Sequence, residues 1–169
     1  LVIAAMSIMN LVSIGQASVE LEEEAKVIQQ RRSAVITLDK SGKNVVFIMM
    51  DRAVDCLIPY IMNEKPELQE QFDGFTWYPN TLSFSFHTNV CVPSLYGGYE
   101  YTPDELKARS DESLKDKHNE SLKVMPVIFL DNGYDVTVCD APYANYQWVA
   151  DMSIYDEYPG IHAYNTIGS

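Results

Sequence analysis

The sequence predicts an α/β fold in which a mostly parallel sheet is flanked by helices. The first observation is the apolar run NVVFIMM at residues 44–50, which is typical of a strand buried on both faces of a parallel sheet. The second is a helical pattern at residues 110–134 that is followed by a strand pattern, DVTVC, at residues 135–139. Strand, helix and strand in this order imply parallel pairing through right-handed crossovers.

The remaining elements can be predicted in chain order. AVITL, at residues 34–38, is a short β-prone segment, and KSGK is a turn signal before the run at 44–50. Apolar residues then recur at helical spacing over residues 54–61. Residues 75–86, FTWYPNTLSFSF, are expected to be extended, and Pro79 indicates an irregular or edge position. The helix at 110–134 carries an apolar stripe, with a possible kink at Pro126 and an Asn-Gly stop signal near its end.

Length and charge restrict the classes of protein to which this chain belongs. The 169 residues are enough for one sizeable core, so one domain is expected. A net charge of −12 argues against nucleic acid as a partner, because neutralising phosphates requires clustered Lys and Arg. The three cysteines lack a C-x-x-C pair, which fits neither a disulfide framework nor a zinc ribbon.

The first residues form an uncharged apolar run, LVIAAMSIMNLVSIG. The run is apolar on all sides, which favours the C-terminal part of a transmembrane helix at residues 1–15, although a buried core helix is the alternative. Residues 16–42 are then interpreted as a membrane-proximal helix and linker, and residues 43–169 as the N-terminal part of a catalytic domain. We expect the chain to be a piece of a longer protein.

Asp51 stands where the predicted strand at 44–50 ends. Ligands of open parallel sheets bind beyond the carboxyl ends of the strands, so this position suits a functional carboxylate, and Asp140 has the same place after residues 135–139. A carboxylate after an apolar run also needs a compensating partner, such as Arg52, a helix end or a metal ion. The alternative is that Asp51 only caps the following helix.

A second group of candidate residues lies in FHTNVCVPSLYGG, at residues 86–98. Thr88 offers a hydroxyl, which is a poor nucleophile unless a metal or a base activates it. Cys91 offers a thiol three residues later. A turn that opens a helix here would direct backbone N–H groups toward an anion on the Thr88 oxygen.

The order of these motifs resembles the start of the catalytic domain in the alkaline phosphatase–sulfatase superfamily. NVVFIMMDRA is similar to a buried strand that ends in an acidic metal ligand, with Asp51 where lipoteichoic acid synthases and phosphoethanolamine transferases usually carry Glu. TNVCVP, from Thr88 to Pro93, matches their T-x-x-[small]-x-P pattern, and HNESLKVMPVIFLDNGYDVTV is similar to the helix and strand that follow the nucleophile. The resemblance covers roughly residues 43–140.

The resemblance implies a two-step phosphoryl-group transfer with Thr88 as the nucleophile. It also implies a divalent cation, zinc or manganese with calcium and magnesium as alternatives, held by Asp51, Thr88 and an Asp-His pair. No Asp-His dipeptide occurs in the sequence, so the remaining ligands are expected beyond residue 169 and this chain alone is expected to be inactive. Weaker candidates for contacts to a substrate phosphate are Asn89, Arg52, Lys117 and His118, although a solvated His118 on a charged helical face is the simpler interpretation.

Three functional hypotheses follow. The first is a phosphoryl-headgroup transferase, phosphodiesterase or phosphatase that acts on an anionic lipid or a phosphorylated cell-envelope glycan. This enzyme would be anchored in the cell membrane, with its catalytic domain on the extracytoplasmic side. The second is a sulfatase, because CVPSL resembles C-x-P-S-R; Cys91 would then be the formylglycine precursor, but Leu95 replaces the arginine. The third is a non-catalytic α/β module.

Overall fold

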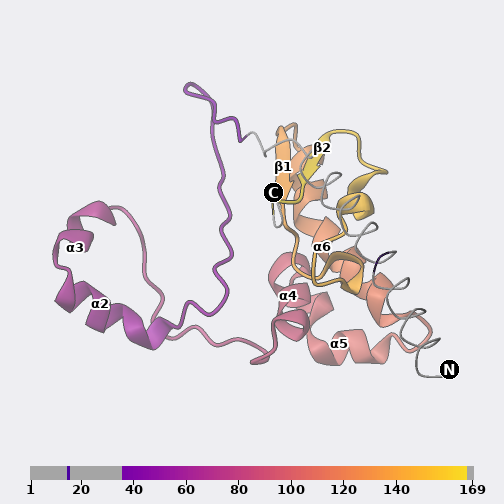
Figure 1. The fold of residues 1–169 in the computed structure, drawn as a ribbon, viewed down its shortest axis with the longest axis horizontal. Helices are drawn as coiled ribbons and strands as arrows, with labels where there is room; N and C mark the ends of the chain where they lie inside the picture. Colours follow the sequence, from indigo (N-terminus) through magenta and orange to yellow (C-terminus); the bar gives the residue numbers. More distant parts are fainter. Residues whose placement is uncertain (1–14, 16–35, 167–169) are drawn as a thin grey trace, which may run out of the picture.

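The computed structural model describes residue 15 and residues 36–166. Helices and a small two-stranded parallel sheet make up the described part, which agrees with the predicted α/β class at this coarse level (Figure 1). The elements in chain order are η1 (Asp55–Leu57), α2 (Ile58–Glu64), α3 (Glu67–Gln71), α4 (Thr88–Gly97), η2 (Tyr99–Tyr101), α5 (Pro103–Ala108), α6 (Leu114–Asp131), β1 (Val136–Cys139), η3 (Ala144–Tyr146), η4 (Met152–Tyr155) and β2 (Ile161–Tyr164).

The core lies where α4 and α6 pack against each other and α6 packs against the sheet (Figure 1). β1 and β2 run parallel, with Val136 opposite Ile161 and Cys139 opposite Tyr164. The buried apolar residues come from α4, α6, both strands and the crossover between the strands: Val92, Leu122, Val136, Val138, Ala141, Ala144, Ala150, Tyr155 and Ile161. The crossover is built from η3 and η4 and contains no α-helix.

Helix α6 confirms the strongest helix prediction and begins a few residues later than the pattern suggested. Ser113 caps it, and its hydroxyl accepts a hydrogen bond from the Asp116 backbone N–H at 3.1 Å. Pro126 is buried within the helix, which continues past it to Asp131. Gly133, with φ of 80°, follows the helix end and allows the chain to turn into β1.

The prediction of a strand at residues 44–50 is wrong for this structure. These residues are extended, but they form no ladder with any strand of residues 36–166. The side chains of Val46, Ile48 and Met50 are 62%, 74% and 71% exposed, whereas Phe47 packs edge-to-face on Tyr96 with ring centroids 5.5 Å apart. The segment therefore touches the core on one side without completing the sheet, and a strand without a partner gains no ladder hydrogen bonds.

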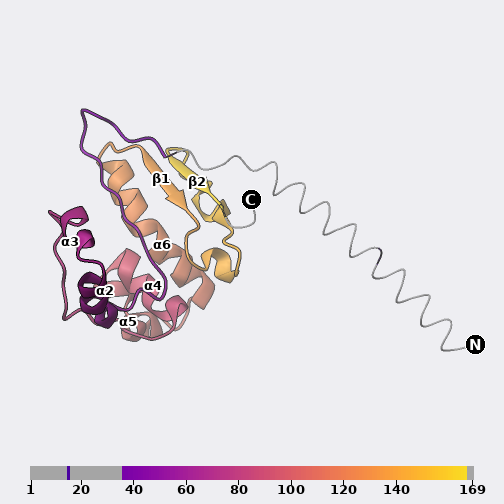
Figure 2. The same ribbon diagram turned by 60° about the vertical axis from the view of Figure 1, so that its left-hand side comes forward.

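Helix α2 confirms the helical spacing seen over residues 54–61, with η1 leading into it. Together with α3 it lies apart from the sheet (Figures 1 and 2). Residues 75–86, which were expected to be extended, form no strand and have no regular secondary structure, and a turn at residues 79–80 agrees with the irregular position expected at Pro79.

Within residue 15 and residues 36–166, no helix has both the length and the apolar character that a membrane crossing requires. The predicted transmembrane segment at 1–15, apart from its last residue, and residues 16–35 lie outside the described residues.

Candidate functional site

Asp51 lies in an exposed turn after the extended segment 44–50. The turn is closed by a hydrogen bond from the Ala53 N–H to the Met50 carbonyl at 3.4 Å, and Arg52 adopts a left-handed backbone conformation with φ of 58°. The next helix, η1, begins at Asp55 and has Val54 at its N-cap. Asp51 is therefore not a helix cap, and that alternative explanation of its position is wrong.

The side chain of Asp51 contacts Thr88, which lies 37 residues later in the chain. The Thr88 hydroxyl donates a hydrogen bond to Asp51 Oδ1 at 3.1 Å. Thr88 is the first residue of α4, after His87 in an extended N-cap conformation. The first N–H groups of a helix lack partners within the helix, and its dipole favours negative charge there. The structure thus brings the two principal candidates together at the start of α4.

The oxygen pair of Asp51 and Thr88 suits a divalent cation in chemistry and in spacing. Two oxygen ligands, each about 2.1 Å from one cation, are separated by roughly 3.0–3.4 Å when the angle between them is tetrahedral or octahedral. The observed 3.1 Å fits this range. Two ligands are nevertheless fewer than a stable site needs, and among residues 36–166 no group of three or more His, Cys, Asp and Glu side chains is placed to hold a metal.

Cys91, the alternative nucleophile, lies one helical turn beyond Thr88. It is a half-buried free thiol, and its Sγ donates to the Thr88 carbonyl at 3.5 Å. Leu95, at the position where the sulfatase signature has an arginine, is 46% exposed. Among the described residues, the hydrogen bond of the Asp51 carboxylate goes to Thr88, and that of the Cys91 thiol goes to the helix backbone.

Two of the weaker candidate residues, Lys117 and His118, are buried and hydrogen-bond backbone carbonyls. Lys117 is buried, and its ammonium donates to the carbonyls of Leu106 and Arg109 at 2.7 and 2.9 Å, where it fixes the end of α5 against α6. His118 is fully buried, and its Nε2 donates to the Pro142 carbonyl at 2.9 Å. Burial lowers the pKa of the His118 imidazole, against the opposing effect of that carbonyl. The expectation of a solvated His118 is wrong, because the ring is fully buried. Phosphate contacts from Lys117 and His118 stay a prediction, although both side chains are engaged in hydrogen bonds to backbone carbonyls.

Asn89 and Arg52 flank the Asp51–Thr88 pair in sequence. Arg52 is exposed in the turn, and Asn89 is half-buried at the second position of α4. Burial raises the pKa of Tyr146, and the Asn89 side chain acts in the opposite direction. Sequence reasoning did not place Tyr146, whose ring lies edge-on to the His118 ring, because nothing in its local pattern brings residue 146 to α6.

Asp140, at the end of β1, has a different environment from Asp51. Its carboxylate accepts a hydrogen bond from the Thr166 N–H at 2.7 Å, and its own N–H donates to the Tyr164 carbonyl at 3.0 Å. The carboxyl end of β1 is thereby joined to the residues that follow β2.

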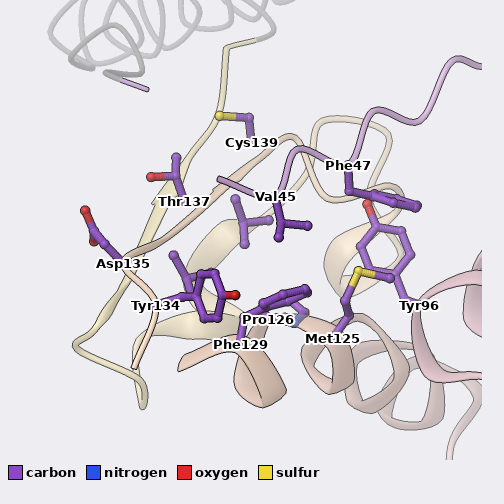
Figure 3. Close-up of a pocket in the computed structure, with 12 residues that line it drawn as sticks. Val45, Phe47, Tyr96, Met125, Pro126, Phe129, Tyr134, Asp135, Thr137 and Cys139 are labelled. Atoms are coloured by element: carbon purple, nitrogen blue, oxygen red, sulfur yellow. The ribbon is translucent and has the colours of Figure 1, made fainter. Parts of the chain in front are cut away.

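A cavity of about 170 Å³ with a mixed polar and apolar lining lies between segment 44–50, α6 and β1 (Figure 3). Phe47, Tyr96 and Phe129 form part of its wall, and β1 forms another part. None of the candidate site residues lines it, so the cavity is separate from the Asp51–Thr88 pair.

No protein-family model, curated protein sequence or solved structure matches this chain significantly.

Proposed function

We propose that this chain carries the nucleophile of a metal-dependent phosphoryl-headgroup transferase, phosphodiesterase or phosphatase with an alkaline phosphatase-like catalytic domain. The observation that supports this proposal best is the hydrogen bond between Thr88 and Asp51, two residues singled out separately by their motifs and separated by 37 positions. A contact of this kind between a hydroxyl and a carboxylate is the arrangement that activates an alcohol for attack.

The proposed reaction has two steps. In the first, Thr88 Oγ1 forms a bond to phosphorus while the bond from phosphorus to the leaving alcohol breaks. The proton of the Thr88 hydroxyl passes along its hydrogen bond to Asp51 Oδ1 and on to the leaving alcohol, so that Asp51 is again a carboxylate. In the second step, the oxygen of an acceptor alcohol or of water forms a bond to phosphorus, the bond from phosphorus to Thr88 Oγ1 breaks, and the acceptor's proton returns to Thr88 Oγ1. The start of α4 offers its unpaired N–H groups to the phosphoryl oxygens.

The proposal includes a divalent cation, zinc or manganese with calcium or magnesium as alternatives, held by Asp51, Thr88 and further ligands outside the described residues. When bound, such a cation supplies positive charge that lowers the pKa of an alcohol and neutralises phosphoryl oxygens. A protein with a net charge of −12 needs such a local source of positive charge to bind an anionic substrate.

The same proposal assigns a substrate and a location. An anionic lipid or a phosphorylated cell-envelope glycan would be the substrate, and the apolar N-terminal run would anchor the domain at the cell membrane on its extracytoplasmic side. Cys91 is a weaker candidate nucleophile than Thr88, because its Sγ faces the helix backbone and Asp51 contacts the threonine.

Manganese titration of the purified full-length protein, followed by electron paramagnetic resonance, tests the proposed ligands. We expect Asp51→Asn to weaken Mn²⁺ binding by at least about 10-fold, because a charged ligand is lost. Asp55→Asn is the matched control: it removes the same charge four residues later, on a carboxylate that accepts from the Trp77 indole, and should leave binding unchanged. Equal binding by wild type and Asp51→Asn would exclude Asp51 as a ligand.

Mass spectrometry after incubation with an aryl phosphodiester tests the nucleophile in the same full-length protein. A mass increase of one phosphoryl ester on Thr88, absent in Thr88→Val, is expected. An aldehyde at Cys91 and an unmodified Thr88 would support the sulfatase alternative instead.

A further inference from the structure

Two adjoining hollows lie on the opposite side of α6 from α2 and α3 (Figures 1 and 2). The amide hollow, of about 420 Å³, lies between α6 and the crossover from β1 to β2, and its wall includes Asn119 and Asn145. The tyrosine hollow, of about 340 Å³, lies between the end of η4 and β2. Asp156 lines both hollows, so they adjoin. None of the candidate site residues lines either one, so the hollows are separate from the Asp51–Thr88 pair.

Hydrogen bonds fix the side chains of the amide hollow. Asn119 Oδ1 accepts from the Asn145 N–H at 2.9 Å, and Asn119 Nδ2 donates to Asn145 Oδ1 at 2.7 Å. Asn145 Nδ2 in turn donates to Asp151 Oδ2 at 2.8 Å. Each carboxamide nitrogen has two N–H groups, and these bonds use one of each. The hollow therefore combines amide donors in fixed directions with the carboxylates of Asp156 and Glu157 as acceptors.

Asn145 lies in this wall with an unusual backbone conformation. Tyr143, Asn145 and Tyr146 have φ of 57°, 54° and 57°, in the left-handed region that residues other than glycine seldom adopt. Such conformations cost free energy, persist only where surrounding contacts hold them, and cluster at binding and catalytic sites. The three bonds of Asn119 and Asn145 supply that constraint, and a ligand that uses the fixed amides would account for it.

The charge of the amide hollow restricts the ligand. Lys123 Nζ lies 2.6 Å from Glu157 Oε1 and 5.8 Å from the centre of the Tyr158 ring. Among the residues that line the hollow, this single ammonium faces two carboxylates, those of Asp156 and Glu157. The balance is negative, which disfavours a phosphate or any other anion. The hollow therefore suits a neutral ligand.

The tyrosine hollow adds aromatic surface to the polar groups. Tyr155, Tyr158 and Tyr164 line it together with His162. Tyr158 and Tyr164 are half-buried, so part of each side chain can contact a ligand. A tyrosine offers an apolar ring and a polar hydroxyl, which suits ligands that have an apolar face and a polar rim.

We propose that the two hollows together bind a neutral disaccharide unit of a glycan. A sugar hydroxyl both donates and accepts, so neighbouring hydroxyls match amide N–H groups placed beside carboxylates. A sugar ring also has an apolar C–H face, which packs on the tyrosine side chains of the second hollow. This site goes beyond the proposed function, because its residues differ from Asp51 and Thr88 and its ligand is not the reacting phosphate.

Saturation-transfer NMR and titration calorimetry on the purified full-length protein test the site, with cellobiose, lactose and N,N′-diacetylchitobiose as probes. We expect at least one of them to bind and to receive saturation at its C–H protons when tyrosine ring protons are irradiated. Inorganic phosphate should not compete with it. Binding of none of the three disaccharides, or competition by phosphate, would overturn the inference.

An exposed carboxylate gives the first variant. Asp156→Asn should weaken binding of that disaccharide at least about 5-fold, because a carboxylate accepts stronger hydrogen bonds than an amide carbonyl does. Its exposure means that the substitution leaves the core unchanged. Asp73→Asn is the matched control: it removes the same charge from an exposed aspartate after α3 and should bind the sugar as wild type does. Wild-type affinity in Asp156→Asn would contradict the proposed site.

An aromatic variant tests the second hollow. Tyr164→Leu keeps an apolar side chain and removes the ring, and we expect a loss of about 3- to 10-fold in affinity together with weaker saturation transfer. Tyr60→Leu, whose ring is 74% exposed on α2, is the control and should change neither. Sugar binding should persist in Asp51→Asn, and Mn²⁺ binding should persist in Asp156→Asn. Each site can thus fail its own test without affecting the other.

Discussion

His118 shows how strongly a single residue's environment depends on tertiary packing. Its sequence context, DKHNE, is charged, but the structure buries the ring between α6 and the crossover. Because the Pro142 carbonyl can only accept, Nε2 carries the proton and Nδ1 is left as an acceptor. Nδ1 is buried and has no hydrogen-bond partner among the described residues, and leaving this acceptor unpaired costs free energy. Burial also favours the neutral imidazole over the protonated one.

We expect the protein to lose stability below about pH 6.5 because of His118. Burial lowers the pKa of the folded-state imidazole, so the unfolded chain binds a proton that the folded protein does not. The stabilisation is complete above the unfolded-state pKa and is lost as the pH falls toward the folded-state pKa, with a slope of at most about 1.4 kcal/mol per pH unit. Urea unfolding between pH 7.5 and 5.5 measures this dependence.

Two histidine variants make that measurement specific. His118→Gln should flatten the pH dependence over this range, whatever its effect on stability at pH 7.5. His118→Asn should flatten it to the same degree, because it also removes the imidazole. A steep slope that persists in His118→Gln would contradict the assignment.

For single residues, the sequence predicted correctly those positions that are set by the neighbouring residues in the chain. Asp51 after an apolar run and Thr88 before a small-residue turn were both selected from local pattern, and the structure places them in contact. The burial of Lys117 and His118 could not be predicted, because it depends on α5 and on the crossover, which lie elsewhere in the chain. The place of Tyr146 against the His118 ring could not be predicted, since it depends on a left-handed backbone in the crossover.

At the scale of elements, the apolar segment 44–50 differs most from its prediction. Its sequence is apolar at every position from Val45 to Met50, so periodicity cannot show which side faces the core or whether a partner strand is present. In the structure, Val45 and Phe47 line the cavity beside β1, and Met49 packs against the core. Helix α6 was easier to predict, because its apolar stripe, N-cap and stop signal are all local.

Substitutions on the two sides of segment 44–50 should differ in their effect on stability. Phe47→Ala removes a half-buried ring that packs on Tyr96, and we expect a loss of about 1–2 kcal/mol in the free energy of unfolding. Ile48→Ala, the matched control, changes a side chain that is 74% exposed and should stay within about 0.5 kcal/mol of wild type. Denaturant unfolding measures both values. The reverse order would mean that the outward side of the segment is the packed one.

At the scale of the whole molecule, apolar exposure is distributed unevenly along the chain. Most of the large apolar side chains that are exposed belong to residues 36–86, whereas the core is built almost entirely from residues 92–161. Figure 1 shows the difference, with α4, α6 and the sheet packed together and the segment around α2 and α3 extending from them. The contact between Asp51 and Thr88 joins these two parts of the chain.

This division predicts where a protease cuts first. Phe86 and Trp148 are both largely exposed, at 94% and 83%, so a comparison between them removes side-chain access as a variable. The backbone around Trp148 is tied down, since the N–H groups of Gln147 and Asp151 both donate to the Ala144 carbonyl. Residues 75–86 lack regular secondary structure. Segments with few backbone hydrogen bonds open at lower free energy, and proteolysis follows local opening.

We therefore expect brief chymotrypsin treatment of the full-length protein to cleave after Phe86 at least about 10-fold faster than after Trp148, a ratio that corresponds to roughly 1.4 kcal/mol in opening free energy. Mass spectrometry of the peptides at early times gives both rates. Asp51→Ala should accelerate the cut after Phe86, because it removes the bond that ties Thr88 to the preceding turn, and should leave the cut after Trp148 unchanged. Equal rates at the two sites would show that residues 75–86 are held as firmly as the crossover.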